Sequence, residues 1–583
     1  MIVVEAAVAA PLDTTLHYLV PEELAGEVAV GKRLLVPLGR RNVTAYCLDP
    51  AAAPPTGDFK LRPILDVLDA APLFPAGMIP FFQWIARYYL VPLGEVIGEA
   101  LPAGLIRQSG RRLLLTEAGR AGLPLPAEPP DWLADLVAKG ELSAARTTRV
   151  LRRSRQLVAR WRQEGFLDLA EELSRQRVTA RTETCVCCPP ADPGHDSLKP
   201  SEQKTLALIR QLADGVPGRT VPRRAITGRY PGAAAALRGL AAAGRVRLVE
   251  EPLFRDPFGL PPPFYPAPER LSGEQEEVLA DVGPAIAKGG FAAFLLHGIT
   301  GSGKTEVYLR AAAATLATGR SVLVLVPEIA LATQLEAHFH SRFGARVALL
   351  HSGLSAGERY DQWRLIAGGE KQVVVGARSA IFAPLENPGL IIVDEEHDGA
   401  YKQEDGLRYH GRDLAVMRAH MQGAVVLLGS ATPSLVSYRN AETGKYRLLR
   451  MTARVEDRSL PEVELVDLKT VPTVSGRAPI FSPRLTSALK ENLVRGEQSL
   501  VFLNRRGFAS MVLCQDCGTP VECRHCKVTL TKHKNAGQLV CHHCGYSVPA
   551  ATVCSSCASG RLTSVGFGTE RLEEELRRLL PAA

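Results

Sequence analysis

A glycine-rich stretch in the middle of the chain has the residue types that hold nucleotide phosphates. It reads GITGSGKT from Gly298 to Thr305 and follows the apolar run AAFLL. Glycines let backbone amides turn toward phosphate oxygens, Lys304 can reach the β- and γ-phosphates, and the Thr305 hydroxyl can hold Mg²⁺. The next residues, EVYLRAAAATLATG, favour a helix, whose N-terminus attracts anions. We therefore expect a site for ATP with Mg²⁺, formed by Gly298, Thr300, Gly301, Ser302, Gly303, Lys304 and Thr305.

An acidic pair follows a second apolar run. In GLIIVDEEHD, the letters LIIV predict a buried strand that ends at Asp394 and Glu395. An aspartate there can hold Mg²⁺ through water, and the following glutamate can orient the water that attacks the γ-phosphate. We therefore expect Asp394 to contact the cofactor, and Lys304, Asp394 and Glu395 to be catalytic.

Eight of the twelve cysteines lie between Cys514 and Cys557, all in CxxC pairs. Such spacing in a cytosolic protein indicates zinc, and four thiolates around one ion give a closed, structural site. Eight thiolates make two zinc sites, with sequential or nested pairing both open. We expect His525, His542 and His543 to be neighbours of the sites rather than ligands. The other cysteines, Cys47, Cys185, Cys187 and Cys188, are expected to be ordinary thiols.

The motifs need a parallel sheet to position them. Alternating strand and helix patterns over 269–455 predict a complete doubly wound lobe with the ATP site, in a multidomain α/β protein. Before it, residues 1–105 predict a β-rich domain. Residues 106–185 and 199–256 predict two helical, winged-helix-like units, separated by the segment CCPPADPGHDSLKP. A Pro-rich segment near 255–268 marks the next boundary.

Arginine is concentrated in the first of these helical units. Seven arginines lie between Arg146 and Arg162, and the stretch EGFLDLAEE after them resembles a wing. Contact with DNA through a helix and wing is one interpretation. A helical spacer with water-facing arginines is equally open for this unit, and the spacer is favoured for the second.

The apolar runs of the sequence do not indicate a membrane span. No apolar run reaches the roughly 18 residues that a membrane span needs. The N-terminus has no basic region of the kind that opens a signal peptide, so we expect a cytoplasmic protein. A net charge of +8 permits a polyanionic partner without requiring one.

The order of the motifs resembles that of superfamily 2 DNA helicases. GSGKT is followed by VLVLVPEIALATQ, GARSAIFAPL, DEEH and GSATPS. The stretches HGITGSGKTEVYL and DEEHDGAYKQEDGLRYHGRDLAVMRA, with eight cysteines downstream, resemble the PriA family of replication restart helicases. This resemblance implies a RecA-like lobe and nested zinc sites, one formed by Cys514, Cys517, Cys554 and Cys557, the other by Cys523, Cys526, Cys541 and Cys544.

The same resemblance implies two DNA-contacting regions. An aromatic-rich loop after DEEH would sense single-stranded DNA through Tyr401 and Tyr409, although Leu407 stands where the family usually has an aromatic residue. In the N-terminal domain, Gly39 and Arg62 would belong to a pocket for the 3′ end of a DNA strand. Leu16 and His17 replace an aromatic-acidic pair of that pocket, which weakens the expectation of specific end recognition.

The second helicase lobe is incomplete in these 583 residues. SLVFLNRRGFA predicts one strand and a turn, and TSVGFGTERLEEELRRLLPAA a strand and a helix, on either side of a zinc insert at 514–557. The parts of the lobe, 475–513 and 558–583, leave about 60 residues where at least 100 are normal. Later family motifs of the GTQ…KGHD and QxxGRAGR kind do not occur. A naturally short protein is favoured over a truncated sequence.

Three functions are compatible with these features. The first is a replication restart protein that binds single-stranded and forked DNA and helps reload the replication machinery, with weak or no unwinding. The alternatives are an active 3′→5′ helicase and, more distantly, a zinc-ribbon protein of RNA or transcription. The resemblance implies single-strand-binding protein, other primosome proteins and the replicative helicase loading system as partners, no membrane, and a cytoplasmic, nucleoid-associated location.

Overall fold

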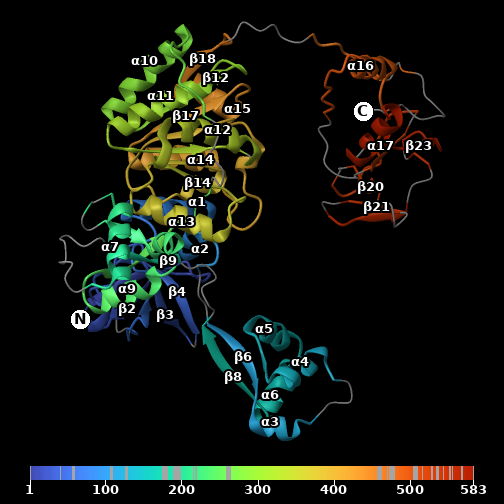
Figure 1. Ribbon diagram of the computed structural model, residues 1–583. Helices are drawn as coiled ribbons and strands as arrows, with labels where there is room; N and C mark the ends of the chain where they lie inside the picture. The colour runs from blue at the N-terminus through green and yellow to red at the C-terminus, as the bar shows by residue number, and fades with distance from the viewer. Residues whose placement is uncertain are drawn as a thin grey trace. The chain divides into compact units, whose positions relative to one another are not determined.

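The computed structural model arranges the chain as two compact units, Met1–Arg458 and Ser459–Ala583 (Figure 1). It describes residues 2–581 apart from 40, 56–59, 106–108, 125–128, 174–180, 188–197, 215, 217–218, 256, 258–263, 328, 456–461, 469–470, 472–479, 503–509, 515, 527–528, 533–537, 542–543, 550–552, 555 and 566–568. Among the described residues, every helix is too short or too polar to span a lipid bilayer.

The N-terminal region is an antiparallel sheet with strand order β2-β1-β4-β3-β5. Its strands are β1 (Ile2–Val8), β2 (Leu16–Val20), β3 (Arg33–Leu38), β4 (Arg41–Asp49) and β5 (Asp66–Val67). Apolar residues of β1, β2, β3 and β4, many of them valines, fill its core. The side chains of Arg33 and Asp69 form a buried ion pair at 2.6 Å, which ties β3 to the segment after β5. The predicted β-rich character of this region is confirmed.

Two helices connect this sheet to the nucleotide-binding lobe. They are α1 (Ile79–Tyr89) and α2 (Leu93–Ala100). Phe81 and Phe82 of α1 belong to the same apolar core as Phe382 and Ile391 of the lobe. The Trp363 indole donates a hydrogen bond of 2.6 Å to the Leu73 carbonyl. The N-terminal region and the lobe therefore share one core.

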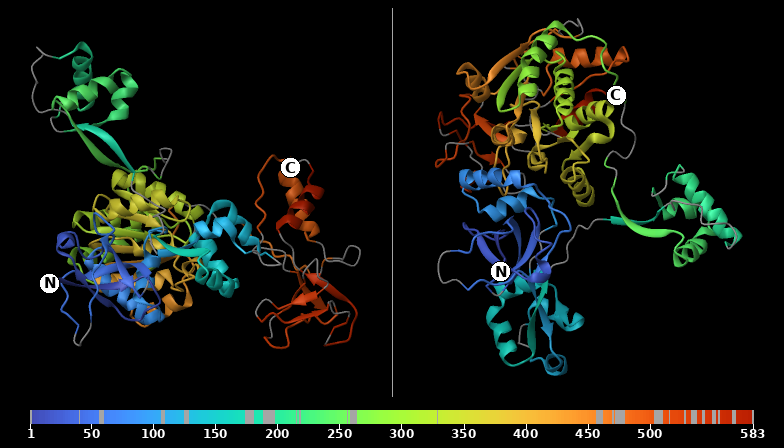
Figure 2. Two further views of the ribbon diagram at one scale, coloured as in Figure 1. Left: turned by 90° about the horizontal axis from the view of Figure 1, so that it is seen from below. Right: turned by 90° about the vertical axis from the view of Figure 1, so that its left-hand side faces the viewer.

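Two units of the same plan follow in the chain. The first contains β6 (Ser109–Leu115), α3 (Glu117–Gly122), α4 (Asp131–Lys139), β7 (Glu141–Leu142), α5 (Ala144–Arg153), α6 (Arg155–Gln163) and β8 (Leu167–Leu173). The second contains β9 (Arg181–Cys187), α7 (Pro200–Leu212), β10 (Thr220–Pro222), α8 (Arg223–Arg229), α9 (Ala233–Ala242) and β11 (Arg247–Leu253). Strand orders β7-β6-β8 and β10-β9-β11 match, and in each unit two long strands form a ribbon that carries the helices (Figure 2).

The division between these units differs from the expected one. Strand β9 pairs along its whole length with β11, from Arg181↔Leu253 to Cys187↔Arg247. It therefore belongs to the second unit, and the expected break at 185 cuts it. The segment CCPPADPGHDSLKP, expected to separate the units, extends from the last residue of β9 to the first residue of α7 and so belongs to the second unit.

The lobe is a seven-stranded parallel sheet with order β14-β15-β13-β16-β17-β12-β18. Its strands are β12 (Ala292–Gly298), β13 (Ser321–Leu325), β14 (Val347–Leu350), β15 (Val373–Gly376), β16 (Pro388–Val393), β17 (Val425–Ser430) and β18 (Arg447–Met451). Its helices are α10 (Gly273–Lys288), α11 (Lys304–Ala317), α12 (Ile329–Phe343), α13 (Ala356–Ala367), α14 (Gly411–Gln422) and α15 (Leu435–Glu442). Two separate apolar cores, one on each face of the sheet, confirm the predicted doubly wound lobe.

The second unit of the molecule, Ser459–Ala583, is built around the cysteine pairs. Its sheet has the order β22-β21-β20-β19-β23 and consists of β19 (Ser510–Cys514), β20 (Thr531–Lys532), β21 (Gln538–Val540), β22 (Ser547–Pro549) and β23 (Leu562–Val565). Helices α16 (Pro483–Val494) and α17 (Thr569–Leu579) lie outside it in sequence.

One expectation about the second lobe is wrong. Ser499–Phe502, the described part of the predicted strand SLVFL, forms no strand, and Leu500 is 96% exposed. A strand needs ladder partners, and the described residues offer none here. Strand β23 and helix α17 form where TSVGFGTERLEEELRRLLPAA predicts a strand and a helix, and β23 pairs with β19, Cys514↔Leu562. Their assignment to a second helicase lobe stays a prediction. The remainder of the SLVFLNRRGFA motif, 503–509, lies outside the described residues.

Candidate functional site

The phosphate loop connects β12 to α11 as its sequence predicts. Gly301 and Gly303 have φ values of 83° and 84°, a region that glycine adopts without strain. Lys304 is the first residue of α11, and its ammonium donates to the Gly298 carbonyl at 2.8 Å. The Ser302 hydroxyl is buried and has no hydrogen-bond partner. Buried hydroxyl groups normally have a hydrogen-bond partner. A phosphate bound at the N-terminus of α11 would supply one for Ser302.

Asp394 follows β16 at the edge of this loop. The Tyr308 hydroxyl, from α11, donates to its carboxylate at 2.9 Å. Burial raises the pKa of Asp394, and Tyr308 and Lys304 oppose this rise. A nearby cation would favour the ionised form, as expected of a Mg²⁺ ligand. Glu395 has a φ of 45°, and such backbone strain in a non-glycine residue is typical of functional sites.

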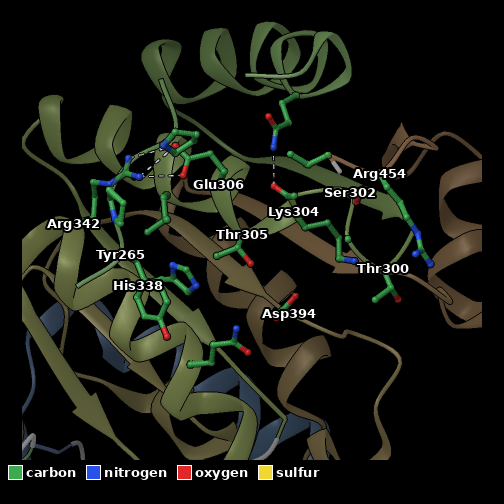
Figure 3. A pocket seen from close by; sticks show the side chains of 18 of the residues that line it. Tyr265, Thr300, Ser302, Lys304, Thr305, Glu306, His338, Arg342, Asp394 and Arg454 are labelled. Carbon is green, nitrogen blue, oxygen red and sulfur yellow. Dashed lines mark hydrogen bonds and ion pairs between the residues drawn. The ribbon is translucent and has the colours of Figure 1, made fainter. Parts of the chain in front are cut away.

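A cavity of about 750 Å³ lies over the loop. Lys304, Thr305 and Asp394 face one space within it (Figure 3). The lining of the cavity includes every residue predicted for the ATP site except Gly298, the last residue of β12, whose carbonyl accepts a hydrogen bond from Lys304. The cavity is lined also by residues that sequence reasoning missed, namely Tyr265, Gln275, His338, Arg342 and Arg454.

The missed residues belong to structured elements around the cavity. Gln275 caps the N-terminus of α10 with Ser272 and donates to the Gly303 carbonyl at 3.2 Å. The spacing S-x-x-Q before an apolar run is a capping-box signal that could have placed this helix. Tyr265 stacks on His338 with ring centroids 4.0 Å apart. The C-terminal part of the Pro-rich segment, which was expected only to mark a domain boundary, therefore lines the cavity.

The residues after Asp394 connect the cavity to the next strand. Glu396 has no exposed surface and accepts hydrogen bonds from the Ser434 amide at 2.7 Å and the Ser437 hydroxyl at 2.7 Å. Arg412, at the start of α14, forms an ion pair with Glu396 at 3.1 Å. The His397 ring lies 2.8 Å from the Ser430 hydroxyl. The GSATPS segment and α14 are thus fixed to the acidic motif.

The predicted DNA-sensing aromatics are buried. Tyr401 is fully buried, and its hydroxyl donates to the Asp394 carbonyl at 2.5 Å. Tyr409 is 5% exposed and lies edge-on to Phe382. Leu407 is buried beside them. A base can stack on either tyrosine only if the loop opens, so their contact with DNA stays a prediction.

The eight cysteine thiols gather in two groups of four. Cys514, Cys517, Cys554 and Cys557 form one group, and Cys523, Cys526, Cys541 and Cys544 form the other, with all sulfur atoms of a group within 4.8 Å of one another. Each group fits one tetrahedral zinc ion held by four thiolates. The geometry therefore selects the nested pairing. His525 lies edge-on to Tyr546, outside both groups, and His542 and His543 lie outside the described residues.

Arg62 and Gly39, the two residues predicted to bind the 3′ end of a DNA strand, are in contact in the N-terminal region. Arg62 donates to the Gly39 carbonyl at 2.8 Å, and both residues are exposed. Gly39 has a φ of 58° in the turn between β3 and β4. Leu16 and His17 are half-buried on β2. Burial raises the pKa of Tyr18, against the effect of the Arg62 charge, so this tyrosine stays neutral near the pocket.

Comparison with known proteins finds a matching family model in three regions of the chain. Family models match at residues 5–102 (3′ DNA-binding domain), 276–440 (DEAD/DEAH box helicase) and 523–549 (PriA DNA helicase Cys-rich region domain). The chain is 34% identical to replication restart protein PriA of Bacillus subtilis, over 98% of this chain and 70% of that protein. The chain belongs to the PriA family.

Two further PriA relatives agree with this assignment. The Haemophilus influenzae protein is 33% identical over 100% of this chain and 69% of its own length. The Synechocystis protein is 35% identical over 97% and 68%. The predicted family, its helicase domain and its zinc-binding cysteines are thereby confirmed, and the chain spans about 70% of the length of these PriA proteins.

Proposed function

We propose that this chain binds single-stranded and forked DNA in the cytoplasm, at the nucleoid, and helps reload the replication machinery at stalled forks. The observation that carries the proposal is the presence, in one chain, of a 3′ DNA-binding domain, a helicase lobe and the PriA cysteine-rich region, in the order found in PriA relatives. A zinc-ribbon protein of RNA or transcription would not need the first two.

We further propose that the cavity binds ATP with Mg²⁺. Bound Mg²⁺ would neutralise charge on the β- and γ-phosphates. Thr305 and Asp394 have the oxygens to hold it, directly or through water. Lys304 would leave the Gly298 carbonyl for the phosphates, and Glu395 would orient the attacking water. Tyr308 supports this arrangement because it holds the Asp394 carboxylate.

Unwinding by these 583 residues is expected to be weak. A helicase of this class needs an arginine from a second lobe to stabilise charge on the transferring phosphate, and its absence costs roughly three or more orders of magnitude in rate. Neither a GTQ…KGHD-like nor a QxxGRAGR-like stretch occurs in the sequence. Arg454 also lines the cavity. It follows β18 of the first lobe, so it is not the arginine that a second lobe would supply.

One pair of measurements on a single sample tests these proposals. Calorimetry should detect ATP binding with Mg²⁺, and Lys304→Ala should weaken it at least tenfold. ATP turnover should stay near background at saturating single-stranded DNA, while forked DNA still binds. Absence of both nucleotide and fork binding in the folded chain would reject the proposal.

An active 3′→5′ helicase is the alternative, and the complete phosphate loop and acidic motif favour it. Its signature would be unwinding of a forked substrate that Lys304→Ala abolishes. Robust unwinding of this kind would replace the weak-activity proposal while leaving the restart role intact.

Recognition of a DNA 3′ end is proposed for Arg62 and Gly39. Arg62→Ala should reduce the preference for a fork with a free 3′ hydroxyl over one with a blocked 3′ end. If the unmodified chain and Arg62→Ala show the same low preference for a free 3′ hydroxyl, the replacement of the aromatic-acidic pair by Leu16 and His17 has removed end recognition.

Protein partners follow from the PriA resemblance and remain proposals. We propose single-strand-binding protein, other primosome proteins and the replicative helicase loading system. Binding of purified single-strand-binding protein to this chain, measured with and without forked DNA, tests the first of these.

A further inference from the structure

The second winged-helix-like unit also contains an arginine-rich stretch without acidic residues, although its arginines are spaced more widely than in the first unit. Residues 146–162 in the first unit contain seven arginines and no acidic residue. Residues 215–249 in the second unit also contain seven arginines and no acidic residue. In both units the basic stretch covers the two helices that precede the last strand, α5–α6 and α8–α9. The second unit therefore has a basic surface at the place where the first has one.

The apolar and basic sides of α8 and α9 are separate. Ile226, Leu237 and Leu240 are buried in the core of the unit. Arg229 and Arg238 are exposed, and α9 places the short side chains of Ala235 and Ala242 beside Arg238 on its exposed side, while the Glu202 carboxylate covers Gly239. Short side chains let a helix approach a phosphate backbone closely, within reach of its arginine.

Acidic groups near this surface are already engaged. Arg224 pairs with Glu183 at 2.9 Å, and Arg219 pairs with Asp214 at 2.5 Å. Glu202, which lies next to Gly239, accepts a hydrogen bond from the Lys199 amide at the start of α7. The Arg219–Asp214 pair is exposed on both sides, and such pairs contribute little and can exchange for phosphate contacts.

The surface fits duplex rather than single-stranded DNA. Proteins that bind single strands stack bases on aromatic rings. Tyr230 is the sole aromatic residue in 215–249, and the Lys204 ammonium lies 4.7 Å from its ring centroid. Duplex DNA needs charge along a surface and no stacking partner.

The end of the unit is fixed to the nucleotide-binding lobe. Arg255, two residues after β11, forms an ion pair at 2.5 Å with Asp361 of α13, whose side chain is fully buried. The Arg364 guanidinium lies 5.3 Å from the ring centroid of the neighbouring Phe254. Duplex bound to this unit would therefore be tied to the lobe that holds the nucleotide.

We propose that the second unit binds the phosphate backbone of a duplex arm through α8 and α9, with Arg229 and Arg238 as contacts. This inference rests on the proposed function, since it names a further contact with forked DNA. It replaces the spacer that the sequence alone favoured for this unit.

The test uses the full chain and measures affinity for a fork, a plain duplex and a single strand at several salt concentrations. In Arg229→Gln/Arg238→Gln, the slope of log affinity against log salt should fall by about 2 for fork and duplex, and affinity near 0.1 M salt by on the order of tenfold. Single-strand affinity should not change. Arg229→Lys/Arg238→Lys should restore most of the loss, because a phosphate contact needs charge rather than the guanidinium shape.

Arg577→Gln/Arg578→Gln is the matched control, since it removes two exposed arginines from α17. An equal loss in this control, an unchanged slope in the Arg229/Arg238 variant, or a loss confined to single strands would overturn the inference while the restart role stands. Failure of the unmodified chain to bind any fork would instead reject the proposed function.

Discussion

Tyr308 connects two parts of the nucleotide site with one hydroxyl. The group donates to Asp394 at 2.9 Å and lies where a side chain on Gly429 would collide with it, at 1.7 Å from an added Cβ. Tyr308 is therefore a positioning residue. The phosphate loop could be predicted from the sequence because its residues are consecutive. Tyr308 could not, because its role depends on how α11 and β16 lie side by side.

Tyr308→Phe should keep ATP affinity without Mg²⁺ and weaken the gain that Mg²⁺ gives. One hydrogen bond to a charged group contributes about 1.5–3 kcal/mol, which is roughly 10- to 150-fold. Calorimetry of ATP with and without Mg²⁺ measures the gain, and Tyr438→Phe on α15 is the control. An unchanged Mg²⁺ gain would contradict the positioning role.

Glu336 is a second residue whose environment predicts a measurable effect. Burial raises its pKa to about 7, and His351, whose own pKa is lowered by burial, lies 3.6 Å away. Since the folded state holds this proton more tightly than the unfolded state, the contribution of Glu336 to stability is fully present below its ordinary pKa of 4.5 and is lost as pH rises through about 7.

Glu336→Gln should therefore raise the free energy of unfolding at pH 8, by on the order of 1–3 kcal/mol, and change it little at pH 5. Thermal unfolding of both proteins at the two pH values measures this. A larger effect of Glu336→Gln at pH 5 than at pH 8 would contradict this assignment and would indicate that His351 ionises instead.

At the scale of elements, the lobe could be predicted best because its strands are continuous apolar runs. LIIV and VVLL are buried on both faces of the sheet, so their pattern is unambiguous. Strand β9 was missed because its partner β11 lies about 60 residues away and a Pro-rich stretch follows it. SLVFL has the pattern of a strand, but a pattern forms a strand only where other strands accept its hydrogen bonds.

The ion pair of Glu396 and Arg412 fixes α14 to the acidic motif. Arg412→Met should destabilise the lobe by about 3–5 kcal/mol, because it leaves a buried carboxylate without its cation. Glu396→Gln/Arg412→Met should recover much of this loss. A double-mutant cycle by chemical unfolding provides the measurement, and purely additive losses would show that the pair is not coupled.

At the scale of the whole molecule, the two units contain different functions. Nucleotide-binding residues lie in Met1–Arg458, and both cysteine groups lie in Ser459–Ala583. Loss of zinc should therefore unfold the second sheet without abolishing ATP binding. The cysteine spacing predicted two ions and left the pairing open, and the family resemblance implied nested pairing. The grouping of the sulfur atoms in the folded sheet, with β19 beside β23, agrees with nesting.

Zinc content tests the pairing directly. The unmodified chain should release two zinc ions when its thiols are titrated with an organomercurial. Cys517→Ser/Cys526→Ser should bind none, because nested pairing damages both sites. Sequential pairing would place both substitutions in one site and leave one ion bound. ATP affinity serves as the control for an intact first unit.

Nested pairing also sets an order of assembly during synthesis. The ligands of the inner site, Cys523 to Cys544, leave the ribosome before Cys554 and Cys557 exist. The inner site can therefore take its metal first and hold β20 and β21 in place. The outer site must wait, with Cys514 and Cys517 exposed to oxidation, until the last cysteine pair emerges. A shortage of zinc during growth should consequently harm the outer pairs first.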